Sequence, residues 1–340
     1  MCGPVSPWRV LNPVSSSPSP DSRVPPPESP EFGGTRFPAR KPPGIPGVRE
    51  WTVSALLFLL TFLSTTFAGL LYAGADANII GLSLFALRHP SVLLHGLSFS
   101  FTFLTILLAH EFGHFFACKH YGIRCTPPYF IPLPFTLAGT LGAFIRIRSP
   151  FNHKRALFDV GIAGPLAGFA FVLPALFIGI ANSQLIPRGN IHGAYNFGEP
   201  LIFRWIGKMM LGYRPELQDM IAHPIAMGAW FGLLATCLNL FPIWQLDGGH
   251  IAYAIFGRNR QKSVSIAGTI LLIAISFVGW PFPSYLVFGI LLLGLGVRYR
   301  FYHPPTLFDE QDVGTARYCL GALALLILVI SFTPVPISVS

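Results

Sequence analysis

The stretch LLAHEFGHFFA, residues 107–117, places two histidines and one glutamate inside a run that is otherwise apolar. His110 and His114 are four residues apart, and Glu111 directly follows the first of them. A titratable side chain at membrane depth is energetically expensive and normally marks a functional site. The stretch therefore predicts a membrane-embedded helix that carries chemistry.

The composition is that of a membrane protein. Of the 340 residues, 52% are hydrophobic and 11% are charged, whereas charged residues make up about 25% of an ordinary soluble domain. The formal net charge of +9 is spread through short segments without an aromatic-interleaved basic block. This distribution is more typical of membrane orientation than of nucleic-acid binding. We therefore expect the lipid bilayer, and no nucleic acid, among the partners.

Several apolar stretches are long enough to cross about 30 Å of hydrocarbon, because a helix rises about 1.5 Å per residue. In the 263–299 region, Pro281 and Pro283 are compatible with either a tight hairpin or a kink. The sequence thus predicts an all-α polytopic membrane protein with about seven transmembrane helices. We place them near residues 52–73, 92–118, 157–181, 221–241, 263–280, 284–299 and 316–335.

The distribution of Lys and Arg predicts the orientation in the membrane. If the N-terminus is cytoplasmic, the inside segments hold 18 positive residues and the outside segments hold 5. The inside segments are 1–50, 119–156, 257–262 and 298–317. We therefore expect the N-terminus and the C-terminal end of the HEFGH helix at the cytoplasmic face, and the plasma membrane as the location if the protein is bacterial.

The connection 119–156 is not an ordinary loop. Its first half contains CTPPYFIPLPF (125–135), which is apolar and interrupted by prolines, and its second half contains GTLGAFIRIRSP (139–150), which alternates as a short strand or hairpin does. Apolar irregular backbone enters a membrane only where protein or a water-filled cavity shelters it. A loop that lies on the membrane interface is the alternative interpretation.

The HEFGH spacing is suited to binding a metal ion. On a helix, His110 and His114 lie about 40° apart on one face and one turn apart, so that both imidazoles can bind one zinc ion. Glu111 projects beside that ion, where a carboxylate can act as a general base. Paired interfacial helix residues without a metal are the alternative.

A zinc site needs at least a third protein ligand. Asp247, in NLFPIWQLDGGHIA (239–252), is the best candidate, and Gly248 and Gly249 would let the backbone bend closely past the metal. His250 is the rival ligand. We interpret Cys118, one turn beyond His114, as a small apolar filler, and Asp159 as a helix N-terminal residue favoured by the macrodipole.

Two motifs in this order resemble the site-2 protease family of intramembrane zinc metalloproteases. HEFGH is followed by NLFPIWQLDGG (239–249), and DVGIAGPLAG (159–168) between them is similar to a glycine-rich helix of that family. The resemblance covers roughly residues 100–257. It implies one Zn²⁺ held by His110, His114 and Asp247, with Glu111 as general base.

The resemblance also implies two further features of the site. Asn239 occupies the position of an asparagine that steadies the substrate carbonyl, although on its residue type alone it is more typical of a helix C-terminal cap. Residues 139–148 are similar to the family's membrane-associated β-element, which could pair with an unwound substrate. No stretch in 182–220 is strand-rich enough for the extracytoplasmic PDZ domain of some members, and we expect no nucleotide-sensing domain after the last helix.

These observations predict an intramembrane zinc metalloendopeptidase that hydrolyses peptide bonds in or near the transmembrane segments of protein substrates. A membrane transporter or metal permease that uses the intramembrane histidines is the alternative, and the oligomeric state stays open. We expect four segments. They are a disordered Pro-rich cytoplasmic tail (1–50), the first transmembrane helix and its connection (51–91), the site-2-protease-like catalytic core (92–257) and the C-terminal transmembrane helices (258–340).

Overall fold

The structure, a computed structural model, describes residues 46–73, 88–134, 136–189, 195–281, 283–309 and 312–338. Most of the expected N-terminal tail lies outside these described residues. The first helix, α1, begins at Val48, so the last three residues of the expected tail are helical instead. Glu50, in the first turn of α1, accepts a hydrogen bond from the Gly47 backbone N–H at 3.2 Å and thereby caps the helix.

Helices occupy all seven places where the sequence predicts a span. Four spans are long and apolar enough to cross a membrane, and they are Val48–Tyr72, Gly96–His120, Lys154–Ala181 and Asp247–Gly279. The other three helices are shorter, so seven membrane-crossing helices are not confirmed. At about 1.5 Å per residue, a 17-residue helix reaches only about 25 Å. The helices are α1 (Val48–Gly69), α3 (Leu93–His120), α4 (Lys154–Ala181), α5 (Leu201–Leu211), α6 (Pro224–Leu240), α7 (Asp247–Ser276), α8 (Leu286–Arg298) and α9 (Thr315–Ser331).

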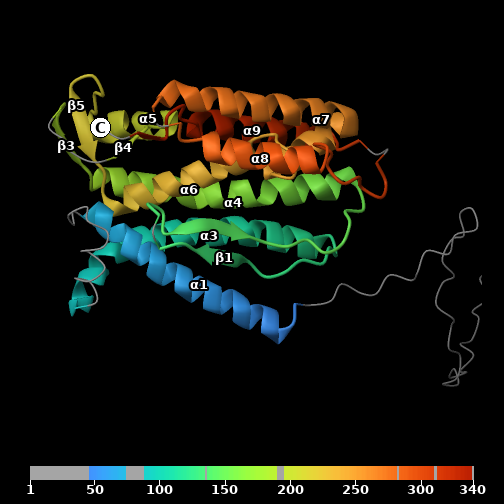
Figure 1. Cartoon of the computed structure of the whole chain (residues 1–340), viewed down its shortest axis with the longest axis horizontal. Helices are drawn as coiled ribbons and strands as arrows, with labels where there is room; N and C mark the ends of the chain where they lie inside the picture. The colour runs from blue at the N-terminus through green and yellow to red at the C-terminus, as the bar shows by residue number, and fades with distance from the viewer. Residues whose placement is uncertain are drawn as a thin grey trace, which may run out of the picture. The chain divides into compact units, whose positions relative to one another are not determined.

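The helices α3, α4 and α6 pack against one another in the middle of the bundle (Figure 1). On one side α1 packs on α3, and on the other side α7 packs on α4 while α9 packs on α6. Small residues allow close backbone approach, as is common between membrane helices. A Cβ added to Gly113 of α3 would lie 2.4 Å from the Ala163 carbonyl oxygen of α4.

The helix α7 begins much earlier than the expected span at 263–280. Its first residue is Asp247, and the helix is broken at Gly257, which has a φ of 76° and a ψ of 174°. A residue with that φ is usually glycine, because a Cβ is strained there. The expected span corresponds to the part of α7 after this break. Between α7 and α8 the chain forms a hairpin, and the two helices pack against each other.

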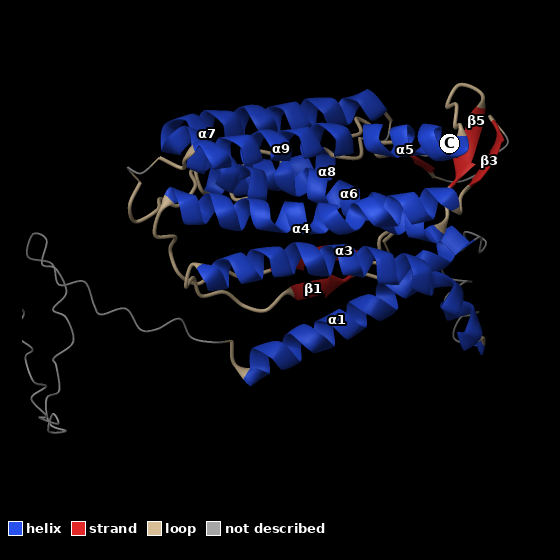
Figure 2. Ribbon diagram, turned by 180° about the vertical axis from the view of Figure 1, so that it is seen from behind, coloured by secondary structure: helices blue, strands red, loops and turns tan. Residues whose placement is uncertain are grey.

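The connection between α3 and α4 forms an antiparallel pair of strands, β1 (Tyr129–Pro132) and β2 (Thr140–Phe144). The second strand was expected, whereas the proline-interrupted first half was not expected to supply its partner. Strand β1 packs on α1, beside α3 (Figure 2). Two further pairs are small, namely β3 (Gln184–Pro187) with β5 (Gln218–Ile221), and β4 (Asn196–Phe197) with β6 (Ile337–Ser338).

Candidate active site

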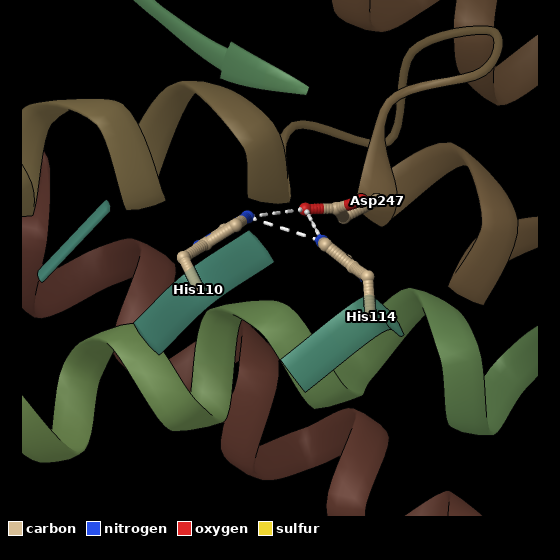
Figure 3. Close-up of side chains that lie close together, drawn as sticks. All are labelled: His110, His114 and Asp247. Carbon is tan, nitrogen blue, oxygen red and sulfur yellow. Dashed lines mark hydrogen bonds and ion pairs between the residues drawn. The ribbon is translucent and has the colours of Figure 1, made fainter. Parts of the chain in front are cut away.

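His110 and His114 project from one face of α3 toward the first residue of α7, Asp247 (Figure 3). One carboxylate oxygen of Asp247, Oδ2, lies 3.1 Å from His110 Nε2 and 3.2 Å from His114 Nε2. The two Nε2 atoms are 3.1 Å apart. The structure therefore brings Asp247 to two histidines, the first of which precedes it by 137 positions.

Helix α4 fixes the orientation of the His114 ring, and α6 contacts the His110 ring. His114 Nδ1 lies 2.7 Å from the Val160 carbonyl oxygen. Because a carbonyl oxygen only accepts, Nδ1 carries the proton, and Nε2 of the neutral ring keeps a free lone pair. Near the end of α6, Asn239 places its amide nitrogen 3.3 Å from His110 Nε2. His114 Nε2 thus presents its lone pair toward His110 Nε2 and Asp247 Oδ2.

The three donor atoms fit a zinc ion. His110, His114 and Asp247 each offer one ligand atom, and these atoms all lie within 4.8 Å of one another. Two nitrogen ligands at about 2.0–2.1 Å from a tetrahedral ion are about 3.3 Å apart. The observed separations of 3.1 Å, 3.1 Å and 3.2 Å are close to that value. The set of two imidazoles and one carboxylate is also one that zinc prefers in proteins.

Glu111 lines the same cavity but does not belong to the group of three donor atoms. The cavity has a volume of about 180 Å³ and also contains His110, His114, Asn239 and Asp247 in its wall. Glu111 is buried, with 5% of its surface exposed, and Ile145, just after β2, lines the same cavity. A carboxylate beside the donor atoms, rather than among them, is positioned to exchange a proton with a molecule in the cavity.

Three glycines of α4 make room for this site. An added Cβ would lie 2.1 Å from His114 Nε2 at Gly164, 3.2 Å from the His110 ring at Gly168 and 2.8 Å from His250 Cβ at Gly161. The family resemblance includes DVGIAGPLAG (159–168) but implies no role for its glycines. The spacing i, i+3, i+7 places them on one helix face, which was the signal available in the sequence.

The glycines after Asp247 pack closely against the preceding turn. An added Cβ would lie 2.0 Å from the Leu240 carbonyl oxygen at Gly248 and 2.2 Å from the Trp244 carbonyl oxygen at Gly249. These glycines therefore allow α7 to begin tightly against the preceding turn. The turn places Asp247 at the start of α7, and the expected bend of the backbone past a metal stays a prediction.

The rival ligand, His250, is not among the converging donor atoms. Its Nδ1 lies 2.6 Å from Nε2 of His303, in the connection between α8 and α9. No motif in the sequence marks His303, because it is an isolated histidine. Cys118 is fully buried in an apolar cluster with Phe115 and Ile123, in agreement with its interpretation as a filler.

Asp159 forms an ion pair, which the sequence did not indicate. Arg317 of α9 donates to both of its carboxylate oxygens, from Nε at 2.8 Å and from Nη2 at 2.6 Å. Tyr121, just after α3, donates a third hydrogen bond to it. Burial, together with this carboxylate, raises the pKa of Tyr121. Asp159 therefore ties together the ends of three helices near the site.

Comparisons with known proteins agree with this geometry. Residues 98–279, just over half of the chain, match peptidase family M50. The chain is 29% identical over 318 residues to a protein of Oryza sativa subsp. japonica named probable zinc metalloprotease EGY1, chloroplastic, a match that covers 86% of this chain and 52% of the relative. The Arabidopsis thaliana protein of the same name is 28% identical over 308 residues, with coverages of 86% and 55%.

A third relative, named probable zinc metalloprotease EGY2, chloroplastic, of Arabidopsis thaliana, is 31% identical over 232 residues, which are 68% of this chain and 40% of the relative. The chain thus spans about half the length of the curated relatives it matches. No solved structure matches the chain.

Proposed function

Because the chain belongs to peptidase family M50, the site-2 protease family, we propose that it is an intramembrane zinc metalloendopeptidase. The convergence of His110, His114 and Asp247, with Glu111 in the same buried cavity, carries the proposal. The donor atoms gather at one place in the described part of the chain, beside a potential general base. A transport path would instead need polar groups along the whole depth of the membrane.

His110, His114 and Asp247 would hold one Zn²⁺. When bound, the ion would supply Lewis acidity toward the scissile carbonyl and make water more acidic. Glu111 would accept a proton from the attacking water and donate it to the leaving amine. Asn239, whose amide nitrogen already points to His110 Nε2, would donate a hydrogen bond to the negative charge that develops on the carbonyl oxygen.

The substrate would be a membrane-spanning protein whose helix unwinds at the scissile bond. Among the described residues, strand β2 pairs only with β1, so its other edge is available to an extended chain. Ala143, Phe144 and the following Ile145 also line the cavity that contains Glu111. A chain that adds to the free edge of β2 would pass the catalytic groups with its backbone held by hydrogen bonds. Helix-breaking residues in the substrate would make unwinding easier.

The finer membrane architecture also belongs to this proposal. All seven helices other than α5 would cross the bilayer, with bilayer thinning around the shorter ones. The 18-to-5 distribution of Lys and Arg supports a cytoplasmic N-terminus and a cytoplasmic active-site end, and in a bacterium the membrane would be the plasma membrane. Residues 92–257 would form the catalytic core and 258–340 the added C-terminal helices.

Peptide cleavage by the purified Glu111→Gln variant tests the proposal. This substitution removes the proposed general base and leaves the three proposed zinc ligands unchanged. We expect purified wild type to cleave a panel of single-span peptides in detergent, and the variant to bind zinc normally while its cleavage falls by several orders of magnitude. Undiminished cleavage by the zinc-loaded variant would remove Glu111 from the mechanism. Zinc uptake into proteoliposomes without any peptide cleavage would favour the transporter instead.

A further inference from the structure

A second cavity adjoins the candidate active site. It has a volume of about 430 Å³, within the range of ordinary ligand sites. The segment after β2, the start of α7 and the connection between α8 and α9 bound it. Five residues line both this cavity and the smaller one with the catalytic groups, so the two cavities share a wall. These residues are Phe144, Ile145, Ile147, Gln245 and His250.

The shared wall indicates where a bound substrate chain would continue after it passes the catalytic groups. Phe144 ends β2 and lines both cavities, and Ile145 and Ile147 continue along the second one. An extended chain paired with the free edge of β2 advances about 3.3 Å per residue. A few residues beyond the scissile bond, its side chains would therefore reach the second cavity.

The second cavity contains one charged side chain, Arg146. Arg146 is exposed and forms no ion pair with any residue that the structure describes. By contrast, Arg148, two residues further on, has its guanidinium 2.5 Å from a Glu50 carboxylate oxygen. The positive charge of Arg146 is thus uncompensated within the described residues, at the edge of a cavity without a carboxylate in its described wall.

The two histidines of the cavity, His250 and His303, form a hydrogen bond with each other as neutral rings. His303 Nδ1 lies 2.6 Å from the Pro304 carbonyl oxygen, so it carries the proton and donates. Nε2 of the neutral ring then accepts from Nδ1 of His250 at 2.6 Å. His303 is 2% exposed, and burial lowers its pKa to about 4. Near neutral pH His303 therefore adds no positive charge to that of Arg146.

Gln245 supplies a neutral polar group where the two cavities meet. Its side chain is exposed and forms no hydrogen bond to the part of the chain that the structure describes. An amide both donates and accepts, so it can bind a peptide backbone in either direction. The wall therefore combines one free cation, one free amide and apolar side chains such as Phe151.

We propose that this second cavity is a specificity subsite, which receives the substrate segment next to the scissile bond and selects an acidic side chain through Arg146. Gln245 would hold the backbone of the same segment. The inference rests on the proposed proteolysis and adds the charge of the preferred substrate. A guanidinium and a carboxylate form paired, charge-assisted hydrogen bonds, which makes Asp or Glu the matching residue.

Cleavage of peptides with altered charge tests the subsite. A series of single-span peptides would carry Glu, Gln or Lys at one position at a time beside the cleaved bond. For the wild type we expect kcat/KM to be about tenfold higher with Glu than with Lys at one such position, and the preference to shrink in 1 M salt. Arg146→Glu should reverse the preference, and Arg146→Gln should abolish it.

Arg124→Glu is the matched control, since Arg124 is exposed on the same connection and lines neither cavity. We expect it to leave the preference unchanged. Normal zinc content in each variant would show that it is folded. If the ratio of kcat/KM for the Glu peptide to that for the Lys peptide were the same in wild type and Arg146→Glu, the proposed subsite would be wrong. The proposed proteolysis would be unaffected by that result.

Binding measurements separate the two proposals. In the Glu111→Gln background, fluorescence anisotropy of labelled acidic and basic peptides reports on the subsite without any cleavage. Tighter binding of the acidic peptide that Arg146→Glu reverses would support the subsite even if the wild type cleaved nothing. Absent cleavage by the wild type would refute only the proposed proteolysis, and binding insensitive to Arg146 would refute the subsite.

Discussion

Replacing Gly164 by Ala should weaken zinc binding without removing any proposed ligand. The new Cβ would lie 2.1 Å from His114 Nε2 and 2.5 Å from both Cδ2 and Cε1 of the same ring. Ordinary contacts of a Cβ begin at 3.4 Å, so atoms must move apart by about 1.3 Å at the closest point. The ring and α4 cannot both stay in place.

The ring has little freedom to move, because His114 Nδ1 donates to the Val160 carbonyl oxygen at 2.7 Å. Tilting the ring breaks that hydrogen bond, whereas shifting α4 disturbs its packing on α3. An overpacked methyl group in a well-packed interior costs about 1–3 kcal/mol of folding free energy. Disturbing a residue that orients a metal ligand lowers metal affinity by about 10–100-fold. For Gly164→Ala we therefore expect a loss of about 1–3 kcal/mol in the free energy of unfolding and a zinc affinity lower by about 10–100-fold.

Competitive zinc titration in detergent would give the affinity, and thermal unfolding of the same samples would give the stability. Gly294→Ala is the matched control, since a Cβ there meets nothing within 4 Å, and it should behave as wild type. In Gly168→Ala the nearest contact of the new Cβ would be 3.2 Å, so its zinc affinity and stability should lie between those of Gly164→Ala and wild type. Wild-type zinc affinity in Gly164→Ala would refute the proposed arrangement of His114.

Three further changes test other parts of the site and its support. Asn239→Ala should lower the rate of peptide cleavage about 100-fold while the protein still binds zinc. If metal analysis showed that the variant had lost its zinc, Asn239 would instead be a residue that positions His110. Asp159→Asn should lower the free energy of unfolding by about 1–3 kcal/mol, because Arg317 loses its partner, and an unchanged thermal midpoint would contradict this. Burial lowers the pKa of His303 from 6.5 to about 4, so the unfolded chain takes up the proton first as the pH falls. Stability should therefore drop by at most about 3 kcal/mol between pH 6.5 and 4, and His303→Gln should flatten this dependence in unfolding titrations; equal slopes would show that His303 is not the cause.

The sequence predicts those parts of the site that local spacing determines. The four-residue interval of His110 and His114 places both rings on one face as soon as the segment is helical. Asp247 could be selected as their partner because few residues of a suitable type lie in an apolar context. The structure confirms that these three side chains converge. The exclusion of Cys118 also follows from its local surroundings.

Contacts between distant segments could not be predicted in this way. Nothing near Asp159 in the sequence indicates that Arg317 pairs with it, and His303 meets His250 only because the α8–α9 connection folds back on α7. Gly257 breaks α7 without a proline, and the charged residues Arg258, Arg260 and Lys262 that follow it interrupt the apolar pattern, so hydrophobicity alone identifies only the part of α7 after the break. Strand β1 was missed because prolines normally argue against a strand, although its one strand partner leaves an edge where proline is tolerated.

The choice between Asp247 and His250 as the third ligand tests the central claim most directly, and zinc analysis of three purified proteins decides it. Wild type and His250→Ala should each contain one zinc ion per chain, and Asp247→Ala should contain little or none. A full complement of zinc in Asp247→Ala together with its loss from His250→Ala would contradict the proposed metal centre.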